Sequence, residues 1–383
     1  MTGAEPLRAV LVDPSLFTAP YDAALTDGLL AAGVEPIWAV RPPRRGDRQP
    51  IASKYVDVLF YRHVDELRWV PGRVRAWVKG LAHGCGLARL GQRVRAQKPD
   101  IVHFQWAVIP ALDALAMTLI RTRCPVILTV HDTTPFNGDR LSLGQTAGYD
   151  LPMKVADHVI VHTEAARQAL LLRGISSAKI TVIPHGPLRL AATPTPTTPR
   201  RDDRYTFLLF GEIKRYKGID VFVDALALLP DSVRARARFI VAGRPRMDLA
   251  PVLARIAELK IQAAVDLRLR RLSDQEVADL FAETDCFVFP YRQIDASGVY
   301  FLVKSLSKWL IASNVGIFAE DITHGVHGTL VAPSDPSALA AAMGRAIAER
   351  PCPAVRPQTS DWTTIGTATR RVYRQAQHRE DRP

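Results

Sequence analysis

The residue types that could do chemistry gather most densely in one stretch, residues 205–228 (YTFLLFGEIKRYKGIDVFVDALAL). An apolar, strand-like run ends at Gly211, and after Gly218 apolar residues recur at helical spacing. Three cations lie between the two glycines: Lys214, Arg215 and Lys217. A strand, a glycine turn and a helix start bring backbone N–H groups and cations to one point, which is a common way to hold a phosphate. The alternative is a solvated basic loop with exposed lysines.

Histidines that follow strand-like runs form a second group of candidates. His131 comes directly after VILTV, and His103 lies at the end of another such run. Open α/β sheets bind ligands outside the carboxyl ends of their strands, so both side chains are placed to line a site. A histidine there can equally be a structural residue. The two interpretations stay open for His103, and we favour the structural one for His162 and His185.

A third candidate is Ser297-Gly298-Val299, where a loop enters a predicted helix. Its N–H groups and the positive end of the helix dipole could face phosphate oxygens. Serine is also a natural N-cap, so capping alone is the alternative.

The composition indicates a folded globular protein with a basic surplus. The 383 residues are 48% hydrophobic and 23% charged, and this length allows two domains with a core each. Lys and Arg number 50 against 38 Asp and Glu, a net charge of +12. That surplus suits an anionic partner: a phosphorylated substrate, an acidic membrane face or nucleic acid. The cysteines are too scattered for a zinc site or a disulfide framework: Cys85, Cys124, Cys286 and Cys352.

Two apolar runs are candidates for export or membrane signals, and both are too short. Ala9–Val12, near the start, has only the length of a strand. The run 109–120 is interrupted by Asp113 and is too short to span a bilayer. We therefore expect a cytoplasmic protein that is at most peripheral on the inner face of the membrane.

Strand-like runs alternate with helical patterns along the whole chain, which predicts parallel sheets with crossover helices. In the first half the predicted strands are 9–12, 36–40, 57–60, 101–104, 126–130, 158–162 and 180–183, with helices near 23–32, 87–97, 112–121 and 164–173. In the second half they are 206–210, 237–242, 265–269, 286–288 and 311–313, with helices at 219–229, 249–260, 274–283 and 299–309. The tail, 360–377, has helical character.

The clearest boundary is the Pro- and Thr-rich stretch 190–203 (LAATPTPTTPRRDD), which is typical of an exposed linker. It divides the chain into an N-terminal Rossmann-like domain, 1–189, and a C-terminal one, 204–358, followed by a helix within 359–383. Two such α/β domains in tandem leave a cleft that faces the carboxyl ends of both sheets.

Several of these segments, in this order, resemble a known family. PVILTVHDTTPF (125–136) resembles its His-Asp motif, 156–186 its approach to the domain hinge, and FGEIKRYKG (210–218) its Gly-x5-Lys-Gly phosphate loop. Residues 269–299 and 312–321 resemble the donor-binding half of the family's C-terminal domain, and residues 323–343 and 361–374 resemble its closing helices. The chain is similar to bacterial retaining glycosyltransferases of the GT-B fold, the "glycosyl transferases group 1" class, which includes exopolysaccharide enzymes.

The resemblance implies transfer of a sugar from a UDP- or GDP-linked donor to a glycan or lipid-linked acceptor, with no metal and no resident cofactor. Fixed cations and N–H groups can stabilise the leaving diphosphate instead. His131 and Lys217 match the catalytic positions, the first contacting the donor sugar and the second the diphosphate. The acceptor side would include His103 and Asp132, the latter orienting His131 or its loop. The donor-binding set is Gly211, Lys214, Arg215, Lys217, Asp295, Ser297, Gly298 and Val299. In this fold the last helix returns to the first domain.

Several positions depart from the family pattern. Glu212 stands where arginine usually follows the loop glycine, and we expect the cations two and three residues later to replace that charge. Ile294 and Leu302 stand where the family has two glutamates, although Asp295 adjoins the first. These changes motivate a second hypothesis, a catalytically silent relative that binds nucleotide-sugar or glycan. A third, a nucleic-acid-binding protein, rests on charge alone because no nucleic-acid module is found.

Residues 62–98 carry much of the basic surplus, with tryptophans and aliphatic residues interleaved: Trp69, Val70, Val74, Trp77, Val78 and Leu81. A basic, Trp-bearing amphipathic segment can lie on an anionic membrane surface. The alternative, which the sequence does not decide against, is a helix that packs its apolar stripe on its own domain.

Overall fold

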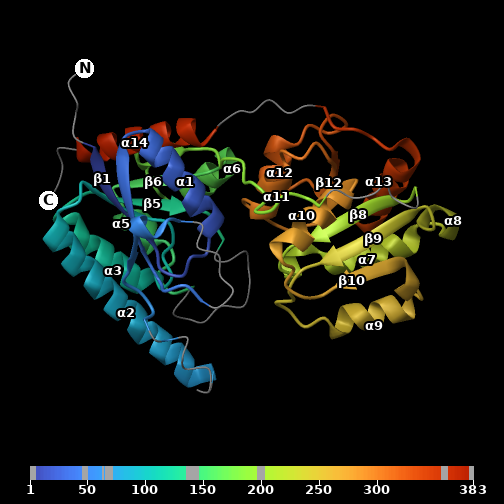
Figure 1. Cartoon of the computed structure of the whole chain (residues 1–383), viewed down its shortest axis with the longest axis horizontal. Helices are drawn as coiled ribbons and strands as arrows, with labels where there is room; N and C mark the ends of the chain where they lie inside the picture. The colour runs from blue at the N-terminus through green and yellow to red at the C-terminus, as the bar shows by residue number, and fades with distance from the viewer. Residues whose placement is uncertain are drawn as a thin grey trace. The chain divides into compact units, whose positions relative to one another are not determined.

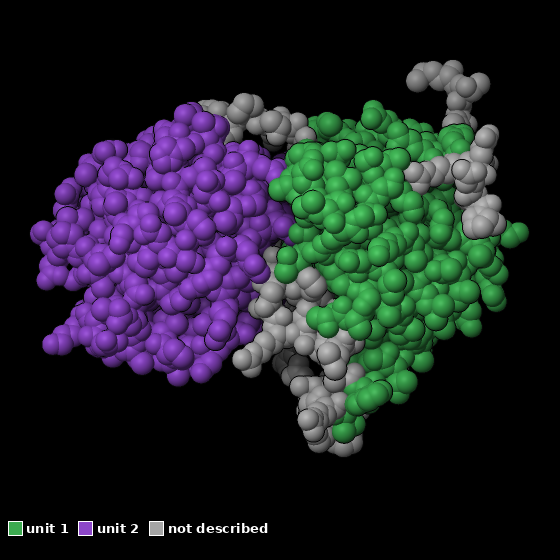
Figure 2. Space-filling model, turned by 180° about the vertical axis from the view of Figure 1, so that it is seen from behind, with its two compact units in different colours: residues 1–135, 140–186, 359–383 green, residues 136–139, 187–358 purple. Residues whose placement is uncertain are grey.

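The computed structural model describes residues 6–44, 51–62, 64, 72–134, 146–195, 203–354 and 361–378. Their contacts divide them into two units, shown in Figure 2. Described residues within 1–135, 140–186 and 359–383 form unit 1, and those within 187–358 form unit 2.

Unit 1 is a parallel sheet with helices on both faces. Its strands lie in the order β3-β2-β1-β4-β5-β6-β7. They are β1 (Leu7–Asp13), β2 (Val34–Val40), β3 (Val56–Val58), β4 (Ile101–Phe104), β5 (Val126–Val130), β6 (His158–Val161) and β7 (Ile180–Val182). The helices are α1 (Ala19–Ala31), α2 (Gly72–Gln97), α3 (Pro110–Arg121), α5 (Leu151–Val155), α6 (Glu164–Leu172) and α14 (Trp362–Gln377).

Side chains of these strands alternate between two apolar cores, one on each face of the sheet. Ala9 and Leu11 of β1 pack with α1 and α14, whereas Val10 and Val12 pack with α2, α3 and α6. Buried strands of this kind read as continuous apolar runs, which is why the sequence located them well.

The C-terminal helix α14 packs against α1, so the last element of the chain belongs to unit 1 (Figure 1). Two glycines allow this close approach: a Cβ on Gly28 would lie 2.1 Å from the Trp362 carbonyl oxygen, and one on Gly366 would lie 2.0 Å from the Gly28 oxygen. The helical character predicted for the tail is confirmed, and the buried face of α14 includes Ile365, Val372 and Tyr373.

Unit 2 is a second parallel sheet, with strand order β10-β9-β8-β11-β12-β13. Its strands are β8 (Tyr205–Phe210), β9 (Ala237–Ala242), β10 (Val265–Arg268), β11 (Cys286–Phe289), β12 (Trp309–Ser313) and β13 (Thr329–Val331). Its helices are α7 (Ile219–Leu228), α8 (Asp231–Arg234), α9 (Ala250–Glu258), α10 (Asp274–Glu283), α11 (Gly298–Val303), α12 (Gly316–Asp321) and α13 (Pro336–Glu349). One core joins the sheet to α7, α9 and α13, and the other joins it to α10, α11 and α12.

The strand order reverses between β1 and β4 in unit 1, and between β8 and β11 in unit 2. Ligands of open α/β sheets bind outside the carboxyl ends of the strands at such a reversal. Each unit therefore has one favoured edge for a site, next to Asp13 in unit 1 and next to Gly211 in unit 2.

The structure corrects some predicted elements. The helix predicted at 299–309 ends at Val303, because Ser307 takes a left-handed backbone conformation (φ 49°) and Trp309 begins a strand. Of the predicted linker, residues 196–202 lie outside the described residues. The part before them is not free: the Thr195 N–H donates to Asp279 (2.7 Å), and Gln275 donates to the Thr193 carbonyl (2.9 Å).

Among the helices that the structure describes, none combines the length and apolar character that a bilayer crossing needs.

Candidate active site

The phosphate-loop candidate of unit 2 runs from the end of β8 to the start of α7. Gly211 and Gly218 both have positive φ angles, 107° and 68°. A Cβ on Gly218 would lie 2.0 Å from the Pro290 carbonyl oxygen, so only glycine fits there. Between them Arg215–Lys217 form a turn of 3₁₀ helix. The loop therefore folds back tightly enough to bring Lys217 to the end of its own strand.

Lys217 is buried, 5% exposed, which argues against the alternative of a solvated loop with exposed lysines at this position. Its Nζ donates to the Phe210 carbonyl (3.4 Å) and lies 5.6 Å from the Tyr291 ring centroid. Burial, together with the charge of Lys214, lowers the pKa of Lys217 to about 8, and Glu212 partly opposes that shift. An anion bound beside it would restore the charged form, because an opposite charge favours ionisation.

The two donor-binding segments predicted for unit 2 meet at Gly211. A Cβ placed on Gly211 would lie 2.6 Å from Lys217 Nζ and 3.0 Å from Val299 Cγ2. Ser297 caps α11, its Oγ accepting the Tyr300 N–H (3.3 Å). The structure thus brings Gly211, Lys217 and the start of α11 together at the strand reversal.

Asp295 and Gly298 lie on the same side of the sheet as this cluster. Asp295 is half-buried, and its carbonyl accepts the Ile317 N–H (3.1 Å), which ties the loop after β11 to α12. A Cβ on Gly298 would meet no atom within 4 Å, so the start of α11 is open.

Glu212 has a partner that the sequence reasoning missed. Arg246, in the loop after β9, donates from Nε to Glu212 Oε1 (2.7 Å) and places Nη2 at 2.6 Å. Arg215 is exposed on the 3₁₀ turn, and Lys214 is half-buried close enough to influence Lys217. The carboxylate beside Gly211 is therefore neutralised from the neighbouring strand, not by the following residues. The signal was present: β8 and β9 are adjacent, so GRPR after β9 ends at the same edge.

In unit 1 the candidate His131 lies in a buried group of rings at the carboxyl ends of β4 to β7. Tyr21 of α1 stands at its centre, with ring centroids 5.0 Å from His131, 5.4 Å from His162 and 4.9 Å from His185. His131 also stacks on Trp106, at 5.0 Å and 14°. Burial holds the pKa of His131 well below its ordinary value, with smaller effects from the neighbouring histidines. His131 is thus a neutral imidazole at neutral pH.

His103 does not reach solvent in this structure. Its ring is 1% exposed, and its two nitrogens contact Tyr373 Oη (2.7 Å) and Thr129 Oγ1 (2.8 Å). Burial lowers its pKa to about 3. This geometry favours the structural interpretation over a place on the acceptor side. Asp132 is half-buried, and its carbonyl accepts the Tyr149 hydroxyl (2.6 Å), which fixes the loop after β5.

Two buried carboxyl groups, Asp13 and Asp22, lie at the strand reversal of unit 1. Asp13 accepts the N–H groups of Ser15 and Thr18, each at 3.2 Å, and the Thr18 hydroxyl donates to Asp22 (3.2 Å). Asp22 Oδ2 is buried without a hydrogen-bond partner. Burial, then the charge of Asp13, raises the pKa of Asp22 well above its ordinary value. Burial also raises the pKa of Asp13, against the opposing effect of its hydrogen bonds, so Asp22 is the carboxyl group of this pair that keeps its proton more strongly.

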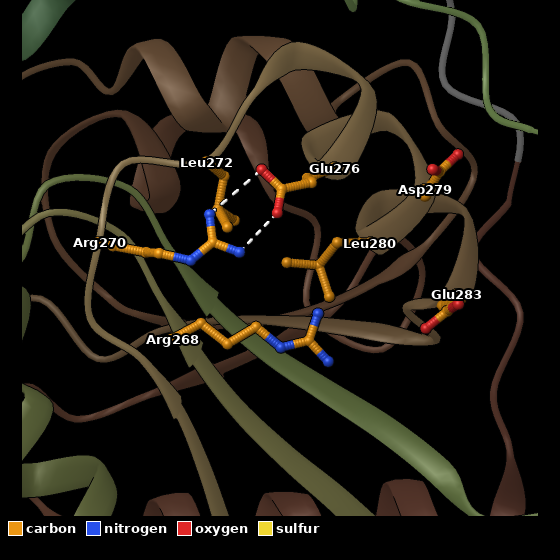
Figure 3. Close-up of a pocket in the computed structure, with 7 residues that line it drawn as sticks. All are labelled: Arg268, Arg270, Leu272, Glu276, Asp279, Leu280 and Glu283. Atoms are coloured by element: carbon orange, nitrogen blue, oxygen red, sulfur yellow. Dashed lines mark hydrogen bonds and ion pairs between the residues drawn. The ribbon is translucent and has the colours of Figure 1, made fainter.

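A pocket of about 350 Å³ lies between β10 and α10 in unit 2 (Figure 3). Arg268 and Arg270 face the acidic side of α10, which presents Glu276, Asp279 and Glu283. Arg270 donates to both carboxylate oxygens of Glu276, at 2.5 and 3.2 Å, and this contact, with hydrogen bonds from Ser273, lowers the pKa of Glu276 to about 2. Most of its charges already have partners, so we assign the pocket no role.

Two glycosyltransferase family models match the chain, one on each side of the unit boundary. Residues 23–186 match "Glycosyltransferase Family 4", and residues 204–349 match "Glycosyl transferases group 1". The chain carries the two domains of a GT-B glycosyltransferase. The predicted α/β fold with two Rossmann-like domains is confirmed, and so is the prediction of a glycosyltransferase of the GT-B type.

Individual relatives agree with this assignment. The glycogen synthase of Mycobacterium tuberculosis is 27% identical over 331 residues, covering 80% of this GT-B glycosyltransferase and 77% of the relative. The crystal structure of HepE from Anabaena with UDP and glucose has a TM-score of 0.68 at 17% identity, covering 96% of this chain and 98% of that one. The catalytic domain of starch synthase IV from Arabidopsis thaliana, bound to ADP and acarbose, reaches 0.66 at 12% identity, covering 98% and 100%. The two structures establish the fold alone.

Proposed function

We propose that this GT-B glycosyltransferase moves a sugar from a nucleoside-diphosphate sugar to a hydroxyl of a glycan or lipid-linked acceptor, with retention at the anomeric carbon and without a metal ion. The observation that carries the proposal is the place of Lys217. Its ammonium lies above Gly211, beside the start of α11, at the strand reversal of unit 2. A buried cation over a glycine at that edge suits a diphosphate.

The chemistry follows from where charge develops. When the bond between the anomeric carbon and the phosphate oxygen breaks, the diphosphate keeps the electron pair and its negative charge grows. Cations held in place before the reaction stabilise that charge without reorganisation. Lys217 is such a cation, because Phe210, Tyr291 and Gly211 surround it and its pKa of about 8 rises when an anion binds. Metal independence is proposed because the chain supplies this charge itself.

His131 is the proposed contact to the transferred sugar. Its ring is neutral and is held by Trp106 and Tyr21. A neutral imidazole offers one N–H donor and one lone pair, which suits a sugar hydroxyl better than a charged ring that only donates. The family resemblance supports the same role for this residue.

A membrane-bound acceptor is supported by the first half of α2. Trp77, Leu81 and Val74 are 79%, 71% and 51% exposed, whereas Leu87, Leu90 and Val94 of the same helix are buried. The exposed stripe therefore points away from the core of unit 1, and Figure 1 shows this end of α2 extending beyond the sheet. That favours the membrane over the alternative in which the stripe packs on its own domain. Lys79 is also exposed there. Trp69 and Val70 lie outside the described residues.

The test is a screen of thermal stability with UDP, GDP, ADP and their sugars. A ligand that binds the native state raises the midpoint of unfolding in proportion to RT ln(1 + [L]/Kd). One nucleoside diphosphate and its sugar should stabilise the protein, and Lys217→Ala should remove most of that shift. If none of them stabilises it, the donor-binding proposal is wrong. Stabilisation without hydrolysis or transfer of the sugar would favour the catalytically silent relative. Binding to DNA or RNA that is lost at high salt would favour the nucleic-acid hypothesis.

A further inference from the structure

We propose that Arg246 is a further residue that binds the donor diphosphate, and that Glu212 is the positioning residue that holds its guanidinium in place. This inference rests on the proposed function, because it assigns a second cation to the same phosphate site.

The backbone places Arg246 at that site. The Arg246 N–H donates to the Ile213 carbonyl (2.9 Å), and the Ile213 N–H donates to the Arg244 carbonyl (2.9 Å). These bonds tie the loop after β9 to the phosphate loop after β8. The two loops are also in close contact where they leave their strands, since a Cβ on Gly243 would lie 2.0 Å from the Gly211 carbonyl oxygen. The backbone of Arg246 is therefore held in place close to Gly211.

The side chain of Arg246 has donors left over for a ligand. A guanidinium carries five N–H donors, and the contact with Glu212 uses Nε and one N–H of Nη2. Three N–H donors are therefore free of Glu212, and the side chain is 44% exposed. A fork of this geometry suits phosphate oxygens, and a carboxylate on one edge of the fork limits how the other edge can turn.

The charges of Glu212 and Arg246 also favour this assignment. A lone carboxylate directly after Gly211 would repel a diphosphate, yet Glu212 is paired with Arg246 at 2.6 Å. The pair has no net charge, so Lys217 and the other loop cations keep their attraction for an anion. Glu212 then acts as a holder of an arginine that comes from the adjacent strand.

The experiment measures the affinity of the full-length protein for UDP and for inorganic pyrophosphate, by calorimetry and by thermal stabilisation. We expect Arg246→Ala to weaken both by tenfold or more, as the loss of a charge-assisted hydrogen bond predicts, and to leave the affinity for uridine unchanged. The matched control is Arg255→Ala. Arg255, on α9, is 43% exposed and pairs with Asp224 of α7 at 2.8 Å, so this variant loses the same charge away from the phosphate loop. Its affinity should stay at the wild-type value.

A double-mutant cycle tests the positioning role of Glu212. Glu212→Gln should weaken pyrophosphate binding about threefold in the wild-type background, where Glu212 holds Arg246. In the Arg246→Ala background, where Glu212 has lost this partner and repels the anion, the same change should instead tighten binding. A purely structural role would change the unfolding midpoint without ligand and spare the affinity. Tighter binding by Glu212→Gln in both backgrounds would show simple repulsion and overturn the proposal, as would wild-type affinity in Arg246→Ala. If the wild-type protein binds neither pyrophosphate nor any nucleoside diphosphate of the stability screen, the proposed function itself fails.

Discussion

His162 Nε2 lies 3.2 Å from His131 Nδ1, and the other ring nitrogen of His162 donates to the Ile183 carbonyl (2.9 Å). Burial lowers the pKa of His162 to about 4, so its ring is neutral and its Nε2 carries a lone pair. His131 Nδ1 must therefore be the donor between them. The tautomer of the proposed sugar-contacting residue is thus set by a histidine to which the sequence suggested only a structural role.

That assignment has a consequence for Gln105. His131 Nε2 lies 3.1 Å from the Gln105 amide and carries the lone pair of a neutral ring. The amide must then present its N–H to this nitrogen, an orientation that the hydrogen-bond network decides. When a sugar hydroxyl takes the place of the amide, His131 Nε2 acts as the acceptor.

The first prediction concerns His162. His162→Leu removes the acceptor for His131 Nδ1–H, so the two tautomers of His131 should mix and turnover should fall about tenfold or more, with little change in KM. Nitrogen chemical shifts of the His131 ring report the tautomer directly. His158→Leu is the control and should keep wild-type turnover, because His158 lies at the start of β6, the strand that ends just before His162, and pairs with Thr181 (2.7 Å). A single unchanged tautomer in His162→Leu would contradict this account.

The second prediction concerns Lys217. Lys217→Ala should lose about two orders of magnitude in turnover, in line with other electrostatic stabilisers of a leaving group. The folded protein should survive, because a buried lysine with a lowered pKa costs folding energy below pH 8, where it must be charged without full solvation. Affinity for UDP in the wild type should fall above about pH 8 as the free lysine loses its proton. If the affinity of the Lys217→Ala variant for UDP falls at the same pH, the titrating group is not Lys217.

The third prediction is a loss of stability in acid. His162 titrates near 4 when folded and near 6.5 when unfolded, so above pH 6.5 its contribution is complete. Between pH 6.5 and 4 only the unfolded chain takes up the proton, and the free energy of unfolding falls. At pH 4.5 this loss is about 2–3 kcal/mol for His162, at roughly 1.4 kcal/mol for each pH unit.

Urea unfolding at pH 7 and pH 4.5 measures the effect. His162→Leu should lose less stability than the wild type between these two values. His103, whose pKa is about 3, contributes in the same direction in both proteins, whereas Asp22, with its raised pKa, acts in the opposite direction. An equal loss in wild type and variant would mean that His162 is not neutral in the folded state.

The fourth prediction concerns the exposed stripe of α2. The protein should bind anionic but not neutral vesicles, since each cation near an anionic leaflet contributes about 1 kcal/mol and salt screens it. Trp77→Ala with Leu81→Ser should weaken binding severalfold. Leu172→Ser removes another exposed leucine, on α6, and should have no effect. Equal binding to both vesicle types, or to neither, rules out this role of α2.

Much of the fold could be predicted from the sequence, and particular elements show why. The predicted bounds of β4, β5, β9 and α10 match the structure, because each is a short apolar or capped segment whose local pattern decides its state. β12 was predicted two residues late, since Trp309 fits a helical face as well as a strand. The short helices α5 and α12 depend on packing against distant segments and have no strong local pattern.

The candidate sites divide in the same way. Gly211, Lys217 and Val299 could be placed together because they follow adjacent strands at the strand reversal. The pair Glu212–Arg246 and the contact from His162 to His131 join residues about 30 positions apart. These residues meet only because of the register of neighbouring strands, and no local sequence pattern predicts that register.

The most direct test of the central claim is the fate of the anomeric carbon. The nucleotide-sugar that stabilises the protein in the screen is incubated with it, and proton NMR follows the released sugar or the transferred product. We predict release of the nucleoside diphosphate with a first-formed sugar of the same anomeric configuration as the donor, slowed about a hundredfold by Lys217→Ala. Release of the opposite anomer would contradict retention, and no release or transfer by the wild type would contradict the assignment of this chain as an active transferase.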